Sequence, residues 1–282
     1  MTNRRRPEFR VARLAESGRV FHALLEDGDI IRELDIDPFG HDSPGADPHT
    51  TVRAAAARAA KSPGRPGEGL TWLAPCAPSK IVGVGRNYLA HIAELHHAAP
   101  EAPLFFLKPP SAILPPGGTI RLPSASSRVD FEGELGVVIG RTASRVSEEL
   151  ALDYVLGYTC VNDVTARDLQ QKDVQFTRAK GFDTFCPFGP CIALGLAPDD
   201  LVVETFVNGQ RRQSSPVSRM IFGLARLISY ISHVMTLQPG DLIATGTPEG
   251  VGPLAQGDQV TVAIEGIGRL TNDVDSAGEP GK

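Results

Sequence analysis

The N-terminal part of the chain shows short hydrophobic stretches separated by turn-forming residues. Residues 8–35 contain three such stretches, which predicts a small meander of strands. Residues 51–60 are rich in Ala and Arg and predict a short helix, and the Pro- and Gly-rich residues 62–69 predict a linker. We therefore expect a small N-terminal β domain with its linker over residues 1–75 and a larger domain over residues 76–282.

In the larger domain, short strand patterns outnumber helical ones. Residues 80–85 predict a short buried strand, residues 103–108 predict a strand that ends at a proline pair, and the Asn208-Gly209 pair between two strand patterns predicts a hairpin. Residues 218–231 carry hydrophobic residues at helical spacing and predict a long helix, and residues 260–274 predict closing strands. The expected fold class is α+β, with mostly β structure.

One strand pattern carries an unusual number of acidic residues. Because alternate side chains of a strand share a face, Asp130, Glu132 and Glu134 are expected on one side. Residues 137–139 are hydrophobic in succession, as in a strand covered on both faces. A second hydrophobic run about thirty residues later ends in Asp163. The pattern predicts that these acids approach one another at the edge of a core.

Buried carboxylates need either cationic partners or a metal ion, because an unpaired buried charge is very costly. Glu132, Glu134 and Asp163 form an all-oxygen set, which suits Mg²⁺, Mn²⁺ or Ca²⁺. The alternative is a solvated edge face with harmless acidic residues.

Two further patterns suggest acid–base or electrostatic chemistry. His91 and Glu94 lie three residues apart in a predicted helix, which places them on one face. They could be a base with its orienting carboxylate, or an ordinary surface pair. Lys180 lies in a predicted loop between Ala and Gly, and the alternative for it is a solvated lysine.

A short helix is expected directly after Asp163. Thr165 and Asp168 have the spacing of a capping box. On such a helix Asp163, Arg167 and Gln170 would share one face. Arg167 and Gln170 should then point toward the same place as Asp163.

Residues 245–252 form a glycine-rich segment without the lysine and spacing of a phosphate-binding P-loop. Its backbone N–H groups, including that of Gly246, could still face an anion.

The composition excludes several classes of protein. A formal charge of −5 argues against a general nucleic-acid surface, and no stretch approaches the roughly 20 apolar residues of a membrane span. The basic start is followed by no apolar run, so we expect no secretory signal and a cytoplasmic protein. The four cysteines are expected to be free thiols. A zinc site at Cys186 and Cys191 is disfavoured because residues 187–190 suggest a tight turn.

Several separate motifs, in order, resemble the signatures of the fumarylacetoacetate hydrolase family. The resemblance runs from about Lys80 to Val274. The motifs are Gly85-Arg86-Asn87-Tyr88, Phe106-Leu107-Lys108-Pro109, Asp130-Phe131-Glu132-Gly133-Glu134-Leu135, Asn162-Asp163-Val164-Thr165-Ala166-Arg167-Asp168 and Thr245-Gly246-Thr247-Pro248-Glu249-Gly250-Val251-Gly252.

The resemblance implies a mixed β-roll or sandwich catalytic domain, a homodimer, and one Mg²⁺ or Mn²⁺ held by Glu132, Glu134 and Asp163. It also implies a small-molecule 2-oxo or diketo acid substrate, with no nucleic-acid or membrane partner. The expected catalytic residues are His91, Glu94 and Lys180. The expected substrate-binding residues are Arg86, Asn87, Tyr88, Lys108, Arg167, Gln170, Gly246 and Thr247.

The reaction that this resemblance favours is hydrolysis of a carbon–carbon bond in an acylpyruvate-like acid. His91, oriented by Glu94, would activate the attacking water, and Lys180 with Gln170 would stabilise the oxyanion. Arg86 or Arg167 would hold the substrate carboxylate. An isomerase of a hydroxymuconate-type diene or an oxaloacetate decarboxylase could use the same site, because the fold does not fix the reaction. A non-catalytic, metal-dependent binding protein is the alternative from another class.

Overall fold

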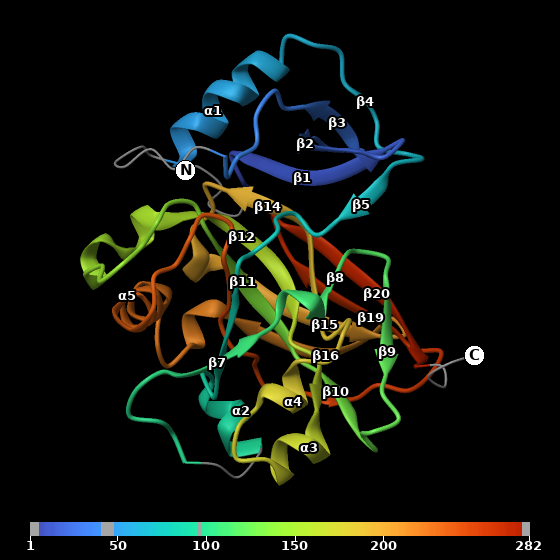
Figure 1. Cartoon of the computed structure of the whole chain (residues 1–282), viewed down its shortest axis with the longest axis vertical. Helices are drawn as coiled ribbons and strands as arrows, with labels where there is room; N and C mark the ends of the chain where they lie inside the picture. Colours follow the sequence, from blue (N-terminus) through green and yellow to red (C-terminus); the bar gives the residue numbers. More distant parts are fainter. Residues whose placement is uncertain (1–5, 41–47, 95–97, 278–282) are drawn as a thin grey trace.

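A computed structural model of the chain describes residues 6–40, 48–94 and 98–277. The predicted N-terminal meander and helix are present, gathered at one end of the molecule in Figure 1. These elements are β1 (Phe9–Glu16), β2 (Arg19–Leu25), β3 (Ile30–Glu33), α1 (Pro48–Ala59), β4 (Arg65–Pro66) and β5 (Thr71–Leu73).

The largest sheet joins this N-terminal part to the centre of the molecule. Its order is β4-β3-β2-β1-β14-β12-β11-β17-β6-β7, with β5 beside β1 and β8 beside β14. Its other strands are β6 (Ile81–Gly85), β7 (Leu104–Lys108), β8 (Ile113–Leu114), β11 (Gly133–Ile139), β12 (Val155–Asn162), β14 (Cys186–Leu194) and β17 (Leu242–Ala244). The N-terminal strands therefore hydrogen-bond to the same sheet that carries the acidic motif.

Two smaller sheets complete the β structure. One has the order β13-β10-β18 and the other β16-β15-β19-β20-β9. Their strands are β9 (Thr119–Leu122), β10 (Val129–Phe131), β13 (Thr165–Ala166), β15 (Val202–Val207), β16 (Gln210–Pro216), β18 (Gly252–Pro253), β19 (Gln259–Ile264) and β20 (Gly268–Ser276). The predicted hairpin is confirmed: Asn208 and Gly209 both have positive φ, at 51° and 77°, as a two-residue hairpin turn requires. The mostly β fold is confirmed as well.

The helices after the N-terminal part are short. They are α2 (Leu89–Glu94), α3 (Arg167–Lys172), α4 (Thr177–Lys180) and α5 (Leu224–Val234), with 3₁₀ turns at Pro110–Ala112, Glu148–Tyr154, Pro198–Asp200 and Val217–Arg219. The prediction that a long helix begins at Ser218 is wrong, because Met220 forms a β-bridge with Tyr88 and Ile221 donates to the Asn87 carbonyl. These contacts keep residues 220–223 out of an α-helix, and α5 begins directly after Gly223.

Strands β11 and β12 are buried along their whole length, as the run of hydrophobic residues at 137–139 predicts. All four cysteines are buried free thiols, also as expected. The tight turn predicted between Cys186 and Cys191 is wrong: both residues lie within β14, which has a cis Gly189-Pro190 bond at an irregular position of its pairing with β12.

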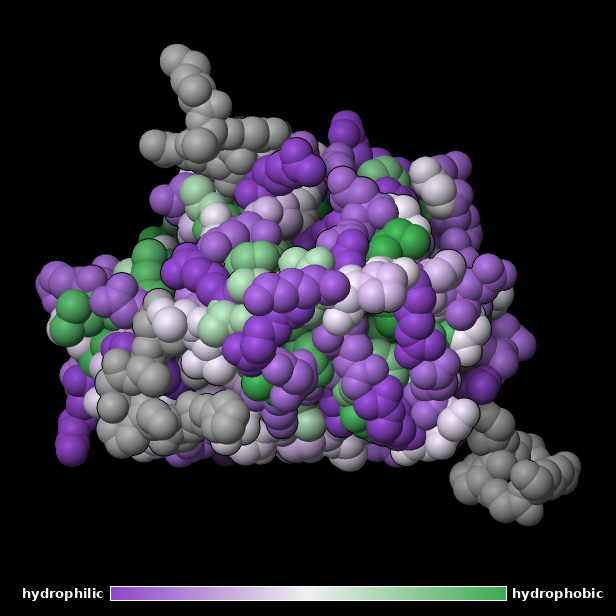
Figure 2. All heavy atoms as spheres, turned by 90° about the horizontal axis from the view of Figure 1, so that it is seen from above, coloured by the Kyte–Doolittle hydropathy of each residue, from purple (hydrophilic) through white to green (hydrophobic). Residues whose placement is uncertain are grey.

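Figure 2 shows the molecule from above the N-terminal end. That face is mainly hydrophilic, with hydrophobic residues scattered across it. In the three described ranges, no helix is long and apolar enough to cross a membrane.

Candidate active site

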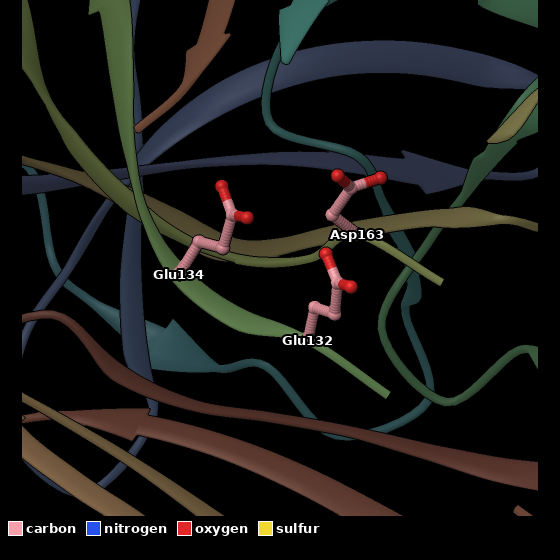
Figure 3. Close-up of side chains that lie close together, drawn as sticks. All are labelled: Glu132, Glu134 and Asp163. Carbon is pink, nitrogen blue, oxygen red and sulfur yellow. The ribbon is translucent and has the colours of Figure 1, made fainter. Parts of the chain in front are cut away.

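Three buried carboxylates converge at the place in the large sheet where β11 begins and β12 ends. Glu132 lies at the break between β10 and β11, Glu134 on β11, and Asp163 directly after β12 (Figure 3). One oxygen from each lies within 4.8 Å of the others, and all three side chains are buried. The alternative of a solvated acidic edge is therefore wrong.

Backbone contacts around Gly133 explain why the carboxylates meet. The Glu132 N–H donates to Asn162 Oδ1 at 3.0 Å, and the Asp163 N–H donates to the Glu132 carbonyl at 2.8 Å. A Cβ atom on Gly133 would lie 1.9 Å from Thr205 Oγ1, so no side chain fits between the two glutamates. The motif needs glycine at this position because a second sheet packs against it.

Two lysines compensate part of the buried negative charge. Lys180 Nζ lies 2.8 Å from Glu132 Oε2 and 2.6 Å from Asp163 Oδ2. Lys108 Nζ lies 2.6 Å from the other oxygen of Asp163 and donates to the Val164 carbonyl at 3.2 Å. Lys180 is only 2% exposed at the end of α4, so the solvated interpretation of this lysine is wrong. Lys108 therefore contacts Asp163 and the adjacent backbone, and it does not line the cavity.

Arg167 is the third cation at this cluster. Its Nη2 donates to Glu132 Oε1, its Nε donates to Asp130 Oδ2 at 2.9 Å, and its Nη1 donates to Gln170 Oε1 at 2.5 Å. Asp130 is fully buried and also pairs with Arg128, at 2.9 Å. Asp130 therefore holds the arginine in place and does not join the three carboxylates.

The local structure that delivers Arg167 differs from the predicted capped helix. Helix α3 begins at Arg167, so Asp163 precedes it and shares no helical face with Gln170. The Thr165 hydroxyl donates to the Asp163 carbonyl, and Asp168 accepts from Ser126 Oγ at 2.5 Å. The predicted capping box is wrong, although Arg167 and Gln170 do reach the cavity beside Asp163.

The electrostatics of the three carboxylates are unequal. Burial raises the pKa of Glu132, but the charges of Lys180 and Arg167 outweigh it and lower that pKa overall. Lys180 shows the converse, because Asp163 and Glu132 raise its pKa against the effect of burial. The pKa of Glu134 is raised well above its usual value by burial and by the charges of Asp163 and Glu132.

Glu134 also tests whether the cluster suits a metal ion. It accepts one hydrogen bond, from the Gly246 N–H at 2.8 Å, and within the described residues it forms no salt bridge. A buried carboxylate beside two others and without a cation of its own lacks compensation, which a divalent ion would supply. The residues therefore fit a hard divalent cation with oxygen ligands.

The predicted His–Glu pair lies at the same cavity. On α2, His91 Nδ1 lies 3.3 Å from Glu94 Oε2, which confirms that they share a face. His91 is only 5% exposed, so it is not a surface histidine. The Gly250 N–H lies 3.2 Å from both Glu94 carboxylate oxygens. The orienting carboxylate is thus itself held by the backbone of another segment.

The three residues before α2 have separate places. Arg86 lines the cavity and has a left-handed backbone, with φ of 58°. The Asn87 side chain is buried and used by backbone groups: Nδ2 donates to the Thr245 carbonyl at 2.8 Å, and Oδ1 accepts from the Phe222 N–H. The Tyr88 hydroxyl is buried without a partner in the described structure, and burial raises its pKa. Of these three, only Arg86 contributes to the cavity wall.

The glycine-rich segment at 245–252 uses its polar groups mainly for contacts that support the site. The Gly246 N–H is taken by Glu134, and a Cβ atom at this residue would lie 2.7 Å from Asn87 Cβ. Thr247 lines the cavity, but its hydroxyl donates to the Gly133 carbonyl at 2.9 Å and accepts from Gln213 Nε2 at 2.8 Å.

The cavity has a volume of about 500 Å³. Its charged and polar lining comprises Arg86, His91, Glu132, Glu134, Asp163, Arg167, Gln170, Gln171, Asp173, Lys180 and Thr247, and its remaining lining comprises Val84, Gly85, Leu104, Phe106, Val174 and Phe176. The predicted residues Asn87, Tyr88, Lys108 and Gly246 lie outside the lining, and Glu94 reaches it through His91.

A family model described as fumarylacetoacetate hydrolase C-terminal matches residues 80–275, which contain every residue of this site. The chain belongs to the fumarylacetoacetate hydrolase family. The family resemblance carried by the sequence motifs is thereby confirmed.

Three proteins similar to this chain have names that describe different reactions. Oxaloacetate tautomerase YisK of Bacillus subtilis is 44% identical over 211 residues, covering 70% of each chain. A structure described as 5-carboxymethyl-2-hydroxymuconate delta-isomerase from Mycobacterium smegmatis is 43% identical, with a TM-score of 0.82 over 95% of this chain and all of that chain. Maleylpyruvate hydrolase from Sphingobium, solved with manganese(II) and pyruvate, is 32% identical, with a TM-score of 0.78 over 95% of this chain and 99% of that one. These similarities support an enzymatic activity.

Three residues support the site in ways that the sequence patterns do not indicate. Asp130 belongs to the acidic strand pattern, Asn162 to a family motif, and Gln213 to the strand pattern that follows Asn208-Gly209. The alternation of the acidic strand could have suggested a partner for Asp130. Gln213 gives no such signal, because it lies among polar residues of a hairpin.

Proposed function

We propose that this protein is a divalent-metal-dependent enzyme that interconverts the enol and keto forms of a short 2-oxo dicarboxylic acid, with oxaloacetate as the first substrate to test. The observation that carries this proposal is the opening of the buried carboxylate cluster into the same cavity as His91. The 44% identity to an oxaloacetate tautomerase supports the choice of substrate.

The proposed metal ligands are Glu132, Glu134 and Asp163, with Mg²⁺ or Mn²⁺ as the ion. When bound, such an ion would act as a Lewis acid toward the 2-oxo and carboxylate oxygens of the substrate. The remaining chemistry is proton transfer: the enol gains a proton at C3 and releases its 2-hydroxyl proton to water, and the reverse reaction restores both. In the tautomer whose Nδ1–H donates to Glu94, the Nε2 lone pair of His91 can take a proton from C3 and later return it.

The charges of the site suit a dianionic substrate. Glu132 and Asp163 contact three cations, Lys108, Arg167 and Lys180, so the formal charges of these cations equal those of the three carboxylates when Glu134 is included. A divalent ion would add two positive charges, which a dicarboxylate would neutralise. Arg86 on the cavity wall offers a further cation to the distal carboxylate.

Hydrolysis of a carbon–carbon bond in an acylpyruvate is the second candidate. It needs an activated water and a stabilised oxyanion, which we assign to the His91–Glu94 pair and to Lys180 with Gln170. In the described structure Lys180 donates to two carboxylates and Gln170 accepts from Arg167. Tautomerisation does not require either side chain to stabilise an oxyanion. A cavity of about 500 Å³ favours hydrolysis, since it accommodates ligands larger than oxaloacetate.

The test follows the ultraviolet absorbance of enol-oxaloacetate with purified protein and Mn²⁺ or Mg²⁺, against the same ion without protein. Wild type should accelerate the conversion. His91→Ala should lower kcat by about 10²–10⁴-fold with metal affinity retained, since a general base contributes that much. His233→Ala, at an exposed histidine of α5, is the matched control.

Other outcomes separate the alternatives. No acceleration by wild type, or equal rates in wild type and His91→Ala, would refute the tautomerase. Pyruvate release from a panel of acylpyruvates would identify the hydrolase, carbon dioxide release from oxaloacetate the decarboxylase, and conversion of a hydroxymuconate the isomerase. Metal-dependent binding of these acids without turnover would identify a non-catalytic binding protein.

A further inference from the structure

Gln213 is a buried amide on β16, away from the cavity lining and outside every motif of the sequence. It is 1% exposed. Its Oε1 accepts from the Gly133 N–H at 3.0 Å, and its Nε2 donates to Thr247 Oγ1 and to the Pro248 carbonyl, both at 2.8 Å. All three partners belong to segments that build the site. One side chain therefore ties the acidic strand to the glycine-rich segment.

Gly133 is the residue between the two proposed glutamate ligands. Its N–H is held by Gln213, and its carbonyl accepts from the Thr247 hydroxyl at 2.9 Å. Gln213, Gly133 and Thr247 thus form a closed triangle of hydrogen bonds. The peptide groups on either side of Gly133 set the directions of Glu132 and Glu134, so this triangle fixes how the two carboxylates approach each other.

The glycine-rich segment carries the same restraint to the His91–Glu94 pair. At its start the Gly246 N–H holds Glu134, and near its end the Gly250 N–H holds Glu94. Gly250 also packs directly on β16: its φ is 93°, and a Cβ atom there would lie 2.3 Å from the Arg212 carbonyl. The backbone beside Gln213 therefore supports the segment at the point where it reaches α2.

We propose that Gln213 is a positioning residue that couples the carboxylate cluster to the His91–Glu94 pair through residues 245–252. Loss of its amide releases the Gly133 peptide and the Thr247–Pro248 turn together. Both Glu134 and Glu94 then lose the fixed N–H donors that orient them. The roles of the cluster and of His91 rest on the proposed function, whereas the coupling itself rests on these contacts.

The first test needs no catalytic activity. Gln213→Met keeps the length of the side chain and removes every hydrogen bond. Ser215→Ala is the matched control, because Ser215 is buried two residues further along β16 and its hydroxyl has no partner among the described residues. For each protein, hydrogen exchange is measured on peptides from α2 and from residues 245–252 without metal. The Kd for Mn²⁺ is measured by titration.

In Gln213→Met both peptides should exchange faster, and the Kd for Mn²⁺ should rise about tenfold or more, the usual effect of losing a group that orients metal ligands. Ser215→Ala should keep wild-type values of both. Should Gln213→Met not fold, Gln213→Asn, whose shorter amide cannot span the same partners, should shift both quantities in the same direction. Wild-type exchange and Mn²⁺ affinity in the Gln213 variant, or equal changes in Ser215→Ala, would overturn the proposal.

A second test uses turnover once a substrate is found. If Gln213 acts on catalysis through Gly250 and Glu94, the losses of kcat in Gln213→Met and Glu94→Ala should not multiply in the double variant. Losses that multiply would overturn the coupling. Absence of any turnover would count against the proposed function alone, because hydrogen exchange and Mn²⁺ affinity decide the coupling separately.

Discussion

Replacing Glu134 with Gln should stabilise the metal-free protein and reduce the stabilisation gained on binding a metal ion. Gln keeps the shape of the side chain and can still accept from the Gly246 N–H. It removes the one carboxylate of the cluster that forms no salt bridge in the described structure. The metal-free fold should therefore lose a source of repulsion, while the proposed ion should lose a charged ligand.

The distances give the size of the effect. Two like charges 4.8 Å apart, the limit found within the cluster, repel by about 3.5 kcal/mol at an effective dielectric constant of about 20. Glu134 faces two such neighbours, and the pull of Lys180 offsets part of the repulsion. We expect metal-free Glu134→Gln to be more stable by about 1–3 kcal/mol. Each kcal/mol of added stability should raise Tm by roughly 2–4 °C.

The stabilisation gained on adding the metal should be smaller in the variant. Mn²⁺ at a thousand times its Kd stabilises the wild-type fold by about 4.1 kcal/mol. If the variant binds a hundredfold more weakly, the same concentration contributes only about 1.4 kcal/mol. Thermal unfolding of both proteins with a chelator and with Mn²⁺ measures all four values. Glu249→Gln, on the neighbouring segment, controls for loss of a carboxylate near the site.

Two results would refute this reasoning. A metal-free variant less stable than wild type would mean that a cation already neutralises Glu134. An unchanged gain on adding Mn²⁺ would mean that Glu134 is not a ligand.

The remaining predictions concern the cations and one surface carboxylate. If the protein hydrolyses an acylpyruvate, Lys180→Met should lower the kcat of that hydrolysis by about a hundredfold, the usual loss for one electrostatic donor, and near-normal hydrolysis in steady-state kinetics at saturating Mn²⁺ would show that this role is wrong. Lys108→Met should instead weaken Mn²⁺ binding by about 10–100-fold with KM little changed, because Lys108 donates to Asp163 and the Val164 carbonyl and does not line the cavity; a titration that gives wild-type affinity contradicts this. The hydrogen bond from Ser126 lowers the pKa of Asp168 to about 2, so its stabilising effect is present above pH 4 and is lost as pH falls toward 2. Melting curves of Asp168→Asn should therefore approach those of wild type between pH 5 and pH 2.5, and a constant difference in Tm would disprove the assignment.

The sequence predicted the parts of the site that depend on local periodicity. Alternation placed Glu132 and Glu134 together, and helical spacing placed His91 beside Glu94, because both patterns are fixed by backbone geometry alone. Asn208-Gly209 predicted its hairpin for the same reason.

The sequence could not predict what depends on partners distant in the chain. The helix expected from Ser218 is displaced by contacts with Tyr88 and Asn87, which lie more than a hundred residues away. The capping box is wrong because Asp168 accepts from Ser126 Oγ and the Ser127 N–H instead of from the Thr165 N–H. Lys108 matched a motif that implied substrate contact, yet only the packing of β7 against Asp163 reveals that it lies behind the cluster.

The pairing of β1 with β14 has a consequence for shortening this protein. β14 hydrogen-bonds to β1 on one side and to β12 on the other, and β12 leads directly into Asp163. A chain that began at Lys80 would lose β1 and leave residues 192–194 of β14 without the strand that pairs with them. Such an edge is a template for pairing with other chains. The N-terminal strands thus cover an edge through which the large sheet could otherwise pair with other chains, even though they contribute no side chain to the cavity.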